Sequence, residues 1–162
     1  SANLICKKSK YLALNAQVNA SNIGYHTIRN YNNFDTLIIN EREIRHEMRD
    51  KTSKVEKLMS SLSKEKNIKN LIVTKGINGS ILYHKMRNKF YYVGAYADKV
   101  VDKIGAGDTM LSVIGPCLKS KMDINTTLLI SSLAAAQSVE TMGNKESINK
   151  IRILKTLENL LK

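Results

Sequence analysis

Two aspartates that flank a glycine turn, Asp102 and Asp108, carry the clearest chemistry in this sequence. The turn is Gly105-Ala106-Gly107, and an apolar run of helical spacing follows Asp108. This order predicts a strand end, a tight turn and a helix with Asp108 in its first turn. The first N–H groups of a helix have no partner within the helix, and the helix dipole makes that end positive. The segment therefore predicts an anion site beside a carboxylate, an arrangement suited to phosphoryl transfer.

The glycine turn differs from two common phosphate loops. Met110 stands where a dinucleotide fingerprint has its third glycine, and no Gly-Lys-Ser/Thr of a Walker A loop follows. The glycines still let the backbone approach a phosphate closely, and the positive helix end favours the ionised form of Asp108. Asp108 is therefore the candidate general base.

A second polar pair, Asn40 and Glu43, follows the apolar run 36–39, which predicts a buried strand. Asn40 and Glu43 have capping-box spacing, so one interpretation is that they only begin a helix that extends to about Met48. The other is that they point into a site at the strand's carboxyl end, where Glu43 could hold water around Mg²⁺. The sequence leaves both interpretations open.

Asn15, Gln17 and Asn19 follow another predicted strand, over residues 11–15. Ligands of open α/β sheets bind at the carboxyl ends of strands, so these side chains are candidate substrate contacts. Turn and capping chemistry before a helix over about 21–31 explains them equally well.

The remaining elements alternate between the helical and the strand period. We expect helices that begin near residues 55, 106 and 124 and strands over 70–74, 80–84 and 89–93. Pro116 should bend or shorten the second of these helices, Asp123 should cap the third, and Gly143 should end it. The last helix has a candidate apolar face of Ile148, Ile151, Leu154, Leu157 and Leu161. This alternation predicts an α/β fold, with a mostly parallel sheet flanked by helices and an antiparallel hairpin.

Composition sets further bounds. The 162 residues are 43% hydrophobic and 25% charged, as expected of one globular domain. No apolar run approaches the ~20 residues of a membrane-spanning helix, and no secretory leader is present, so we expect no membrane partner. Cys6 and Cys117 lack paired spacing, which favours a reducing, cytoplasmic location.

The net charge of +12 is large, but the basic residues are spread along the chain and only 6% of residues are aromatic. Single-strand binders interleave aromatics with basic residues, so we do not expect nucleic acid as a partner, and a basic nucleic-acid binder is kept only as a remote alternative.

Three segments resemble the PfkB or ribokinase-like carbohydrate kinases, in that family's order. Residues 102–108 match its D-x-x-G-A-G-D motif, residues 40–43 match N-x-x-E, and residues 73–79 resemble its nucleotide-binding strand and turn. The Ala134–Ala136 helix that ends near Gly143 is similar to its adenine-side helix. Within the family, residues 15–24 and 40–45 are most similar to the sugar-kinase domain of heptose-phosphate kinase/ADP-heptose synthase type.

The resemblance implies ATP-dependent phosphoryl transfer to a sugar or sugar-phosphate hydroxyl. It makes Asp108 the base and the N–H groups of Gly105, Ala106 and Gly107 the anion hole. Asn40 and Glu43 would organise Mg²⁺ and phosphate, and Asp102 would hold the loop or a monovalent cation such as K⁺. The implied nucleotide contacts are Thr74, Gly76, Gly79 and Gly143.

The resemblance covers only the family's C-terminal half. We therefore expect residues 1–162 to be a partial domain that carries the nucleotide site and the base, without the N-terminal sugar-binding half and lid, and incomplete as an enzyme alone. An uncovered sheet edge would then favour pairing with the missing half or homo-oligomers. The alternative from another class is a non-catalytic nucleotide-binding module.

Overall fold

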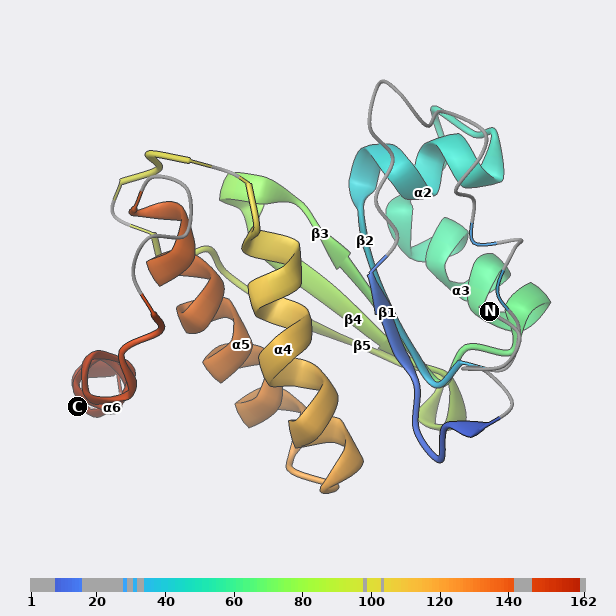
Figure 1. The fold of residues 1–162 in the computed structure, drawn as a ribbon. Helices are drawn as coiled ribbons and strands as arrows, with labels where there is room; N and C mark the ends of the chain where they lie inside the picture. The colour runs from blue at the N-terminus through green and yellow to red at the C-terminus, as the bar shows by residue number, and fades with distance from the viewer. Residues whose placement is uncertain are drawn as a thin grey trace. The chain divides into compact units, whose positions relative to one another are not determined.

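The computed structural model describes residues 8–15, 28, 31, 34–97, 99–102, 104–141 and 147–160. The chain divides into two compact units, residues 1–92 and 93–162, and each is described by itself (Figure 1).

The described residues form one five-stranded sheet in the order β1-β2-β3-β4-β5. The strands are β1 (Ala13–Asn15), β2 (Thr36–Asn40), β3 (Asn70–Thr74), β4 (Ser80–His84) and β5 (Lys89–Val93). The first three strands are parallel, and β4 runs antiparallel to β3. The predicted combination of parallel strands and an antiparallel hairpin is confirmed, although β1 is shorter than the predicted 11–15.

The register aligns the carboxyl ends of the parallel strands. Asn40 at the end of β2 is the Cα partner of Thr74 at the end of β3. Asn15 ends β1 opposite Ile38, two residues before Asn40. The polar residues that end these strands therefore lie along the side of the sheet where the parallel strands have their carboxyl ends, which we call the carboxyl edge.

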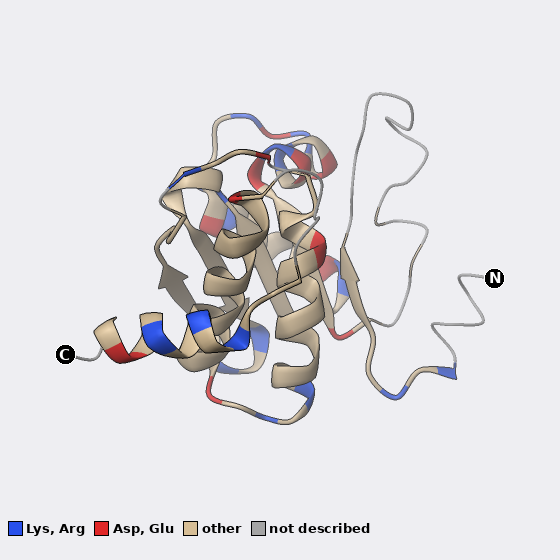
Figure 2. Ribbon diagram, turned by 60° about the vertical axis from the view of Figure 1, so that its left-hand side comes forward, with Lys and Arg blue, Asp and Glu red and all other residues tan. Residues whose placement is uncertain are grey.

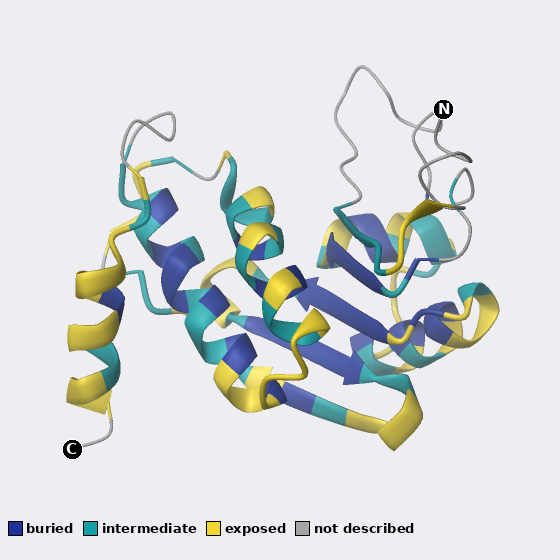
Figure 3. Cartoon of the chain, turned by 60° about the horizontal axis from the view of Figure 1, so that its bottom comes forward, coloured by how far each residue is buried: buried dark blue, intermediate teal, exposed yellow. Residues whose placement is uncertain are grey.

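Two helices, α2 (Glu41–Met48) and α3 (Val55–Lys66), pack on one face of the sheet. Four apolar residues of α3 lie at helical spacing and are all buried: Val55, Leu58, Met59 and Leu62. They share a core cluster with Leu37, Ile39, Leu71 and Val73 from the strands. Each such side chain contributes about 1.5–3 kcal/mol by leaving water. Figure 3 shows the same burial along the strands.

The described residues of unit 2 form three helices, α4 (Ala106–Lys119), α5 (Ile124–Val139) and α6 (Lys150–Leu160). Asp123 caps α5 as predicted, because its side chain accepts a hydrogen bond from Thr126 N at 2.9 Å. Pro116 does not shorten α4, which continues to Lys119. Proline lacks a backbone N–H but keeps its carbonyl, and Pro116 O accepts a hydrogen bond from Ser120 N at 2.9 Å at the end of the helix.

The apolar face predicted for α6 is partly wrong. Ile153 is the buried residue of α6, at 8% exposure, and Ile148 and Leu157 pack with it against α5. Ile151 and Leu154 are instead 65% and 47% exposed. Figure 3 shows the outer side of α6 as exposed.

Within the described residues, no helix is long and apolar enough to cross a membrane. Figure 2 shows Lys and Arg on several elements, α2 and α6 among them, with Asp and Glu between them.

Candidate active site

The start of α2 is closed by its own side chains. Glu43 N donates to Asn40 Oδ1 and Asn40 N donates to Glu43 Oε2, both at 2.8 Å. This reciprocal pair is the capping box that the spacing predicts, so the helix-start interpretation is confirmed. The box also fixes the buried Glu43 side chain at the carboxyl edge. A role in organising Mg²⁺ stays a prediction.

A tight turn follows Thr74, the strand neighbour of Asn40. Lys75 N donates to Gly79 O at 2.8 Å, which closes the turn around a short 3-10 helix, Gly76–Asn78. Gly76 has φ 58° and Gly79 has φ 76° with ψ −141°, and the second combination suits glycine almost alone. No neighbouring atom lies within 4 Å of where a Gly76 Cβ would be, so the turn has open space at that point.

The glycine turn before α4 is open by contrast. Gly105 adopts the left-handed region with φ 86° and ψ −8°, and α4 begins at Ala106 without a side-chain cap. The first helical bond runs from Thr109 N to Gly105 O at 2.8 Å. The N–H groups of Ala106 and Gly107 therefore have no acceptor within the helix. Asp108 is exposed in this first turn.

The segment that leads into the turn is anchored by backbone groups. Val101 N and Asp102 N donate to the same carbonyl, Val139 O at the end of α5, at 2.7 and 3.1 Å. Asp102 Oδ1 accepts from Ile104 N at 2.9 Å, which corresponds to the loop-holding role suggested for Asp102. The sequence did not reveal the part played by Val139, because a backbone carbonyl has no residue-type signature.

The structure thus places the predicted residues in two sets. Unit 1 brings Asn40, Glu43 and Thr74 together at the carboxyl edge. Unit 2 brings the residues from Asp102 to Asp108 together at the start of α4. That the two sets form one site stays a prediction. Asn15 is half-buried at the end of β1, and the other predicted residues, Gln17, Asn19 and Gly143, lie outside the described residues.

The donor set suits a magnesium ion that arrives with a nucleotide. Over the described part of the chain, no three His, Cys, Asp or Glu side chains are grouped to hold a metal ion. Mg²⁺ in phosphoryl-transfer sites commonly keeps water and binds one or two carboxylates together with substrate phosphates. Glu43, fixed at the carboxyl edge, fits that limited role. Asp102 is the candidate carboxylate for a monovalent cation.

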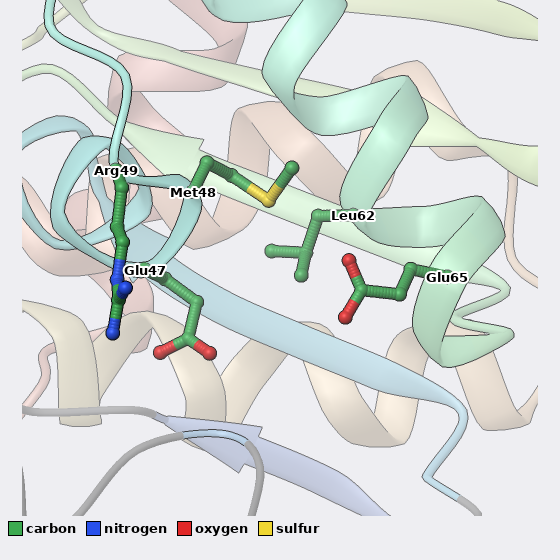
Figure 4. A pocket seen from close by; sticks show the side chains of 5 residues that line it. All are labelled: Glu47, Met48, Arg49, Leu62 and Glu65. Carbon is green, nitrogen blue, oxygen red and sulfur yellow. The ribbon is translucent and has the colours of Figure 1, made fainter.

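A pocket of about 150 Å³ lies between the end of α2 and α3 in unit 1 (Figure 4). The residues that line it are Glu47, Met48, Arg49, Leu62 and Glu65. None of the predicted site residues belongs to it, so this pocket does not correspond to the predicted site.

Comparison with known proteins identifies the family. A family model described as pfkB family carbohydrate kinase matches residues 2–151. The Bifunctional protein HldE of Campylobacter concisus is 33% identical over 118 residues, which cover 70% of this chain and 24% of that protein.

Solved structures show the same fold. The ribokinase of Thermotoga maritima has a TM-score of 0.76 at 22% identity, over 96% of this chain and 52% of that one. The Arabidopsis thaliana ribokinase complexed with ribose and ATP has the same TM-score and identity, over 97% of this chain and 50% of that one. The chain spans about half the length of these ribokinases and about a quarter of its curated relative. The predicted ribokinase-like fold is confirmed, and the chain belongs to the pfkB family of carbohydrate kinases.

Proposed function

We propose that this chain supplies the nucleotide-binding and catalytic-base part of a kinase that transfers a phosphoryl group from ATP to a sugar or sugar-phosphate hydroxyl. One observation carries the proposal: α4 begins at a left-handed glycine, lacks a side-chain cap and holds the exposed Asp108 in its first turn. Membership of the pfkB family supports the same reaction class.

The residues of unit 2 perform the transfer step. The N–H groups of Gly105, Ala106 and Gly107 hold the transferring phosphate and stabilise the charge that develops on it. Asp108 accepts the proton of the attacking hydroxyl. The Asp102 carboxylate and the Val139 carbonyl keep the turn in shape. ATP with Mg²⁺ supplies the phosphoryl group and neutralises part of its charge when bound.

The residues of unit 1 bind the nucleotide and its ion. Thr74 leads into the turn of Gly76 and Gly79, and the exposed Gly76 has open space beside it, suited to close contact with a nucleotide. Gly143 is the proposed nucleotide contact of unit 2. Asn40 and Glu43 lie at the same carboxyl edge as Thr74, where Glu43 would order the water around a Mg²⁺ ion that arrives with the nucleotide.

We propose a sugar phosphate as the acceptor, of the heptose-phosphate type. The similarity of residues 15–24 and 40–45 to that type supports this choice, as does the curated relative of the same kind. Asn15, Gln17 and Asn19 are the proposed contributions of this chain to acceptor binding. We also propose a cytoplasmic location, where ATP is available.

The sugar-binding half of the kinase is the proposed partner of this chain. Among the described strands β1 lies at one edge of the sheet, and it pairs with β2 over only three residues. Unpaired strand edges accept further strands. We propose that the β1 edge pairs with the sugar-binding half, or with a second copy when that half is missing. Light scattering of this chain by itself, and of its mixture with the sugar-binding half, distinguishes self-association from pairing with that half.

The test combines binding and transfer. Calorimetry with ATP and Mg²⁺ measures binding by the chain alone. Transfer is measured as ADP release with a panel of sugars and sugar phosphates, with the sugar-binding half present. We expect Asp108→Asn to leave the Kd for ATP unchanged and to lower kcat about 10²–10⁴-fold.

Asp123→Asn is the matched control, because it makes the same change at the start of α5 and Asn caps a helix as well as Asp. Normal turnover in Asp108→Asn would refute the base assignment. ATP binding without transfer to any acceptor would favour the non-catalytic nucleotide-binding module, and salt-sensitive binding of DNA or RNA in place of ATP would favour the nucleic-acid alternative.

A further inference from the structure

We infer that Arg152 of α6 is a positioning residue for the glycine turn, Gly105-Ala106-Gly107, and that it acts through the end of α5. Its effect on nucleotide binding rests on the proposed function, whereas its effect on the turn does not. The inference follows a chain of contacts that lies entirely within unit 2.

The first link joins the turn to α5. Val139 O accepts hydrogen bonds from two successive N–H groups, those of Val101 and Asp102. The Asp102 side chain then accepts from Ile104 N, one residue before Gly105. The backbone entering the glycine turn is thus set by the position of one carbonyl at the end of α5.

The second link joins the end of α5 to α6. Arg152 forms a short ion pair with Glu140, the residue directly after Val139. Asn149 N donates to Gln137 Oε1 at 2.8 Å, and Gln137 Nε2 donates to Asn149 O at 3.2 Å. These contacts hold the end of α5 at Gln137, which precedes Val139 in sequence, and at Glu140, which follows it.

The Arg152 contact is favourable for two reasons. The Glu140 side chain is only 13% exposed, so its attraction to the guanidinium is less screened than that of a fully solvated pair. Arg152 also brings a positive charge to the carboxyl end of α5, where the helix dipole is negative. Arg152 N donates to Asn149 Oδ1 at 3.1 Å, which ties the two α6 contacts together.

The consequence concerns geometry at the reacting groups. If the last turn of α5 shifts, Val139 O moves, and the backbone groups of Val101, Asp102 and Ile104 move with it. Phosphoryl-transfer sites work mainly by positioning, and a displacement of about 1 Å can cost up to 10²-fold in rate. Arg152 therefore supports the orientation of the N–H groups before Asp108 without touching the substrate.

Amide hydrogen exchange measured by NMR on this chain tests the inference directly. We expect Arg152→Met to speed exchange at Val101, Asp102 and Ile104 about fivefold, the loss expected for one such ion pair. Arg152→Lys should restore most of the protection, because it keeps the charge. Lys155→Met is the matched control: it removes one exposed positive charge from the same helix and should leave these rates unchanged.

Two further readouts separate positioning from general stability and from the proposed function. Exchange at Leu71 and Ile72 in β3 should not change, and the Kd for ATP should rise about threefold in Arg152→Met. Unchanged exchange at Val101 and Asp102, or equal acceleration in β3, would overturn the inference. Faster exchange at the turn in a chain that binds no ATP would support the inference and contradict the proposed function.

Discussion

The starts of α2 and α4 were both predicted to belong to the active site, yet they are built in opposite ways. At α2, Asn40 and Glu43 satisfy each other's backbone N–H groups. At α4, Gly105 has no side chain and the first N–H groups have no acceptor within the helix. A helix start that caps itself is complete without a ligand, whereas one that begins at glycine can accept an anion.

Carboxylates elsewhere in the chain show how backbone N–H groups stabilise an anion. Asp50 accepts hydrogen bonds from Ser53 N and Thr52 N, and these lower the pKa of its carboxyl to about 2. The hydrogen bond from Thr126 N likewise lowers the pKa of Asp123 at the start of α5. We propose that the N–H groups at the start of α4 would offer a similar stabilisation to a phosphate.

The largest effect is expected at the open helix start. Gly105→Ala places a side chain at φ 86°, which costs about 1 kcal/mol and strains the turn that is proposed to hold the phosphate. We expect kcat for phosphoryl transfer to fall about 10²-fold, because the strained turn misaligns the N–H groups of the proposed anion hole. Gly94→Ala is the control, because its Cβ would meet no neighbouring atom. Equal activity of the two variants would remove the distinction between α4 and α2.

The next effect is on stability at the closed helix start. Asn40→Ala removes the acceptor of the Glu43 N–H and should cost about 1 kcal/mol of unfolding free energy. The melting temperature should then fall by about 2–4 °C. Asn40→Asp keeps an acceptor and should unfold like the unaltered chain. A melting temperature that stays constant in Asn40→Ala would show that the box contributes nothing to α2.

Glu43→Gln separates the two interpretations of the same box. Gln can replace Glu in a capping box, so we expect stability to change by less than about 0.5 kcal/mol. If Glu43 orders the water around Mg²⁺, the Mg²⁺ concentration for half-maximal activity should rise about tenfold. A magnesium titration of the activity of the unaltered protein and of Glu43→Gln measures this shift. An identical titration curve would leave Glu43 with a capping role only.

The smallest effect concerns the Asp50 carboxyl. Its pKa of about 2 in the folded chain lies below the usual 3.8. The associated stability is therefore fully present above about pH 4 and is lost as the pH falls through about 2. An NMR titration of the side-chain carboxyl should give a midpoint near 2, and Asp50→Asn should remove that transition. A midpoint near 3.8 would mean that these N–H groups do little for an anion.

Local patterns predicted much of the fold, since their determinants are close in sequence. The capping box at Asn40, the cap at Asp123 and the buried stripe of α3 each depend on residues within two helical turns. The alternation of strands and helices then restricted the topology to a few choices. The glycine turn before α4 could be placed for the same reason.

Features that depend on tertiary packing could not be predicted. In α6, Ile151 and Ile153 are both apolar, and helical spacing alone does not decide which of them meets α5. The anchoring of Val101 to Val139 O joins segments 38 residues apart through backbone atoms. The residue types involved do not indicate either contact, so only the structure could show how the segment before the glycine turn is anchored.

The short first strand has a consequence for the order of folding. A turn of five residues joins β3 to β4. The paired residues of β1 and β2 are instead 23 positions apart in sequence, and these two strands share only three paired positions. Closing the longer loop costs more chain entropy and brings less contact in return. We expect β3 and β4 to pair early, and β1 to join last and to detach first. Asn15 would then adopt its place at the carboxyl edge only in the final folding step.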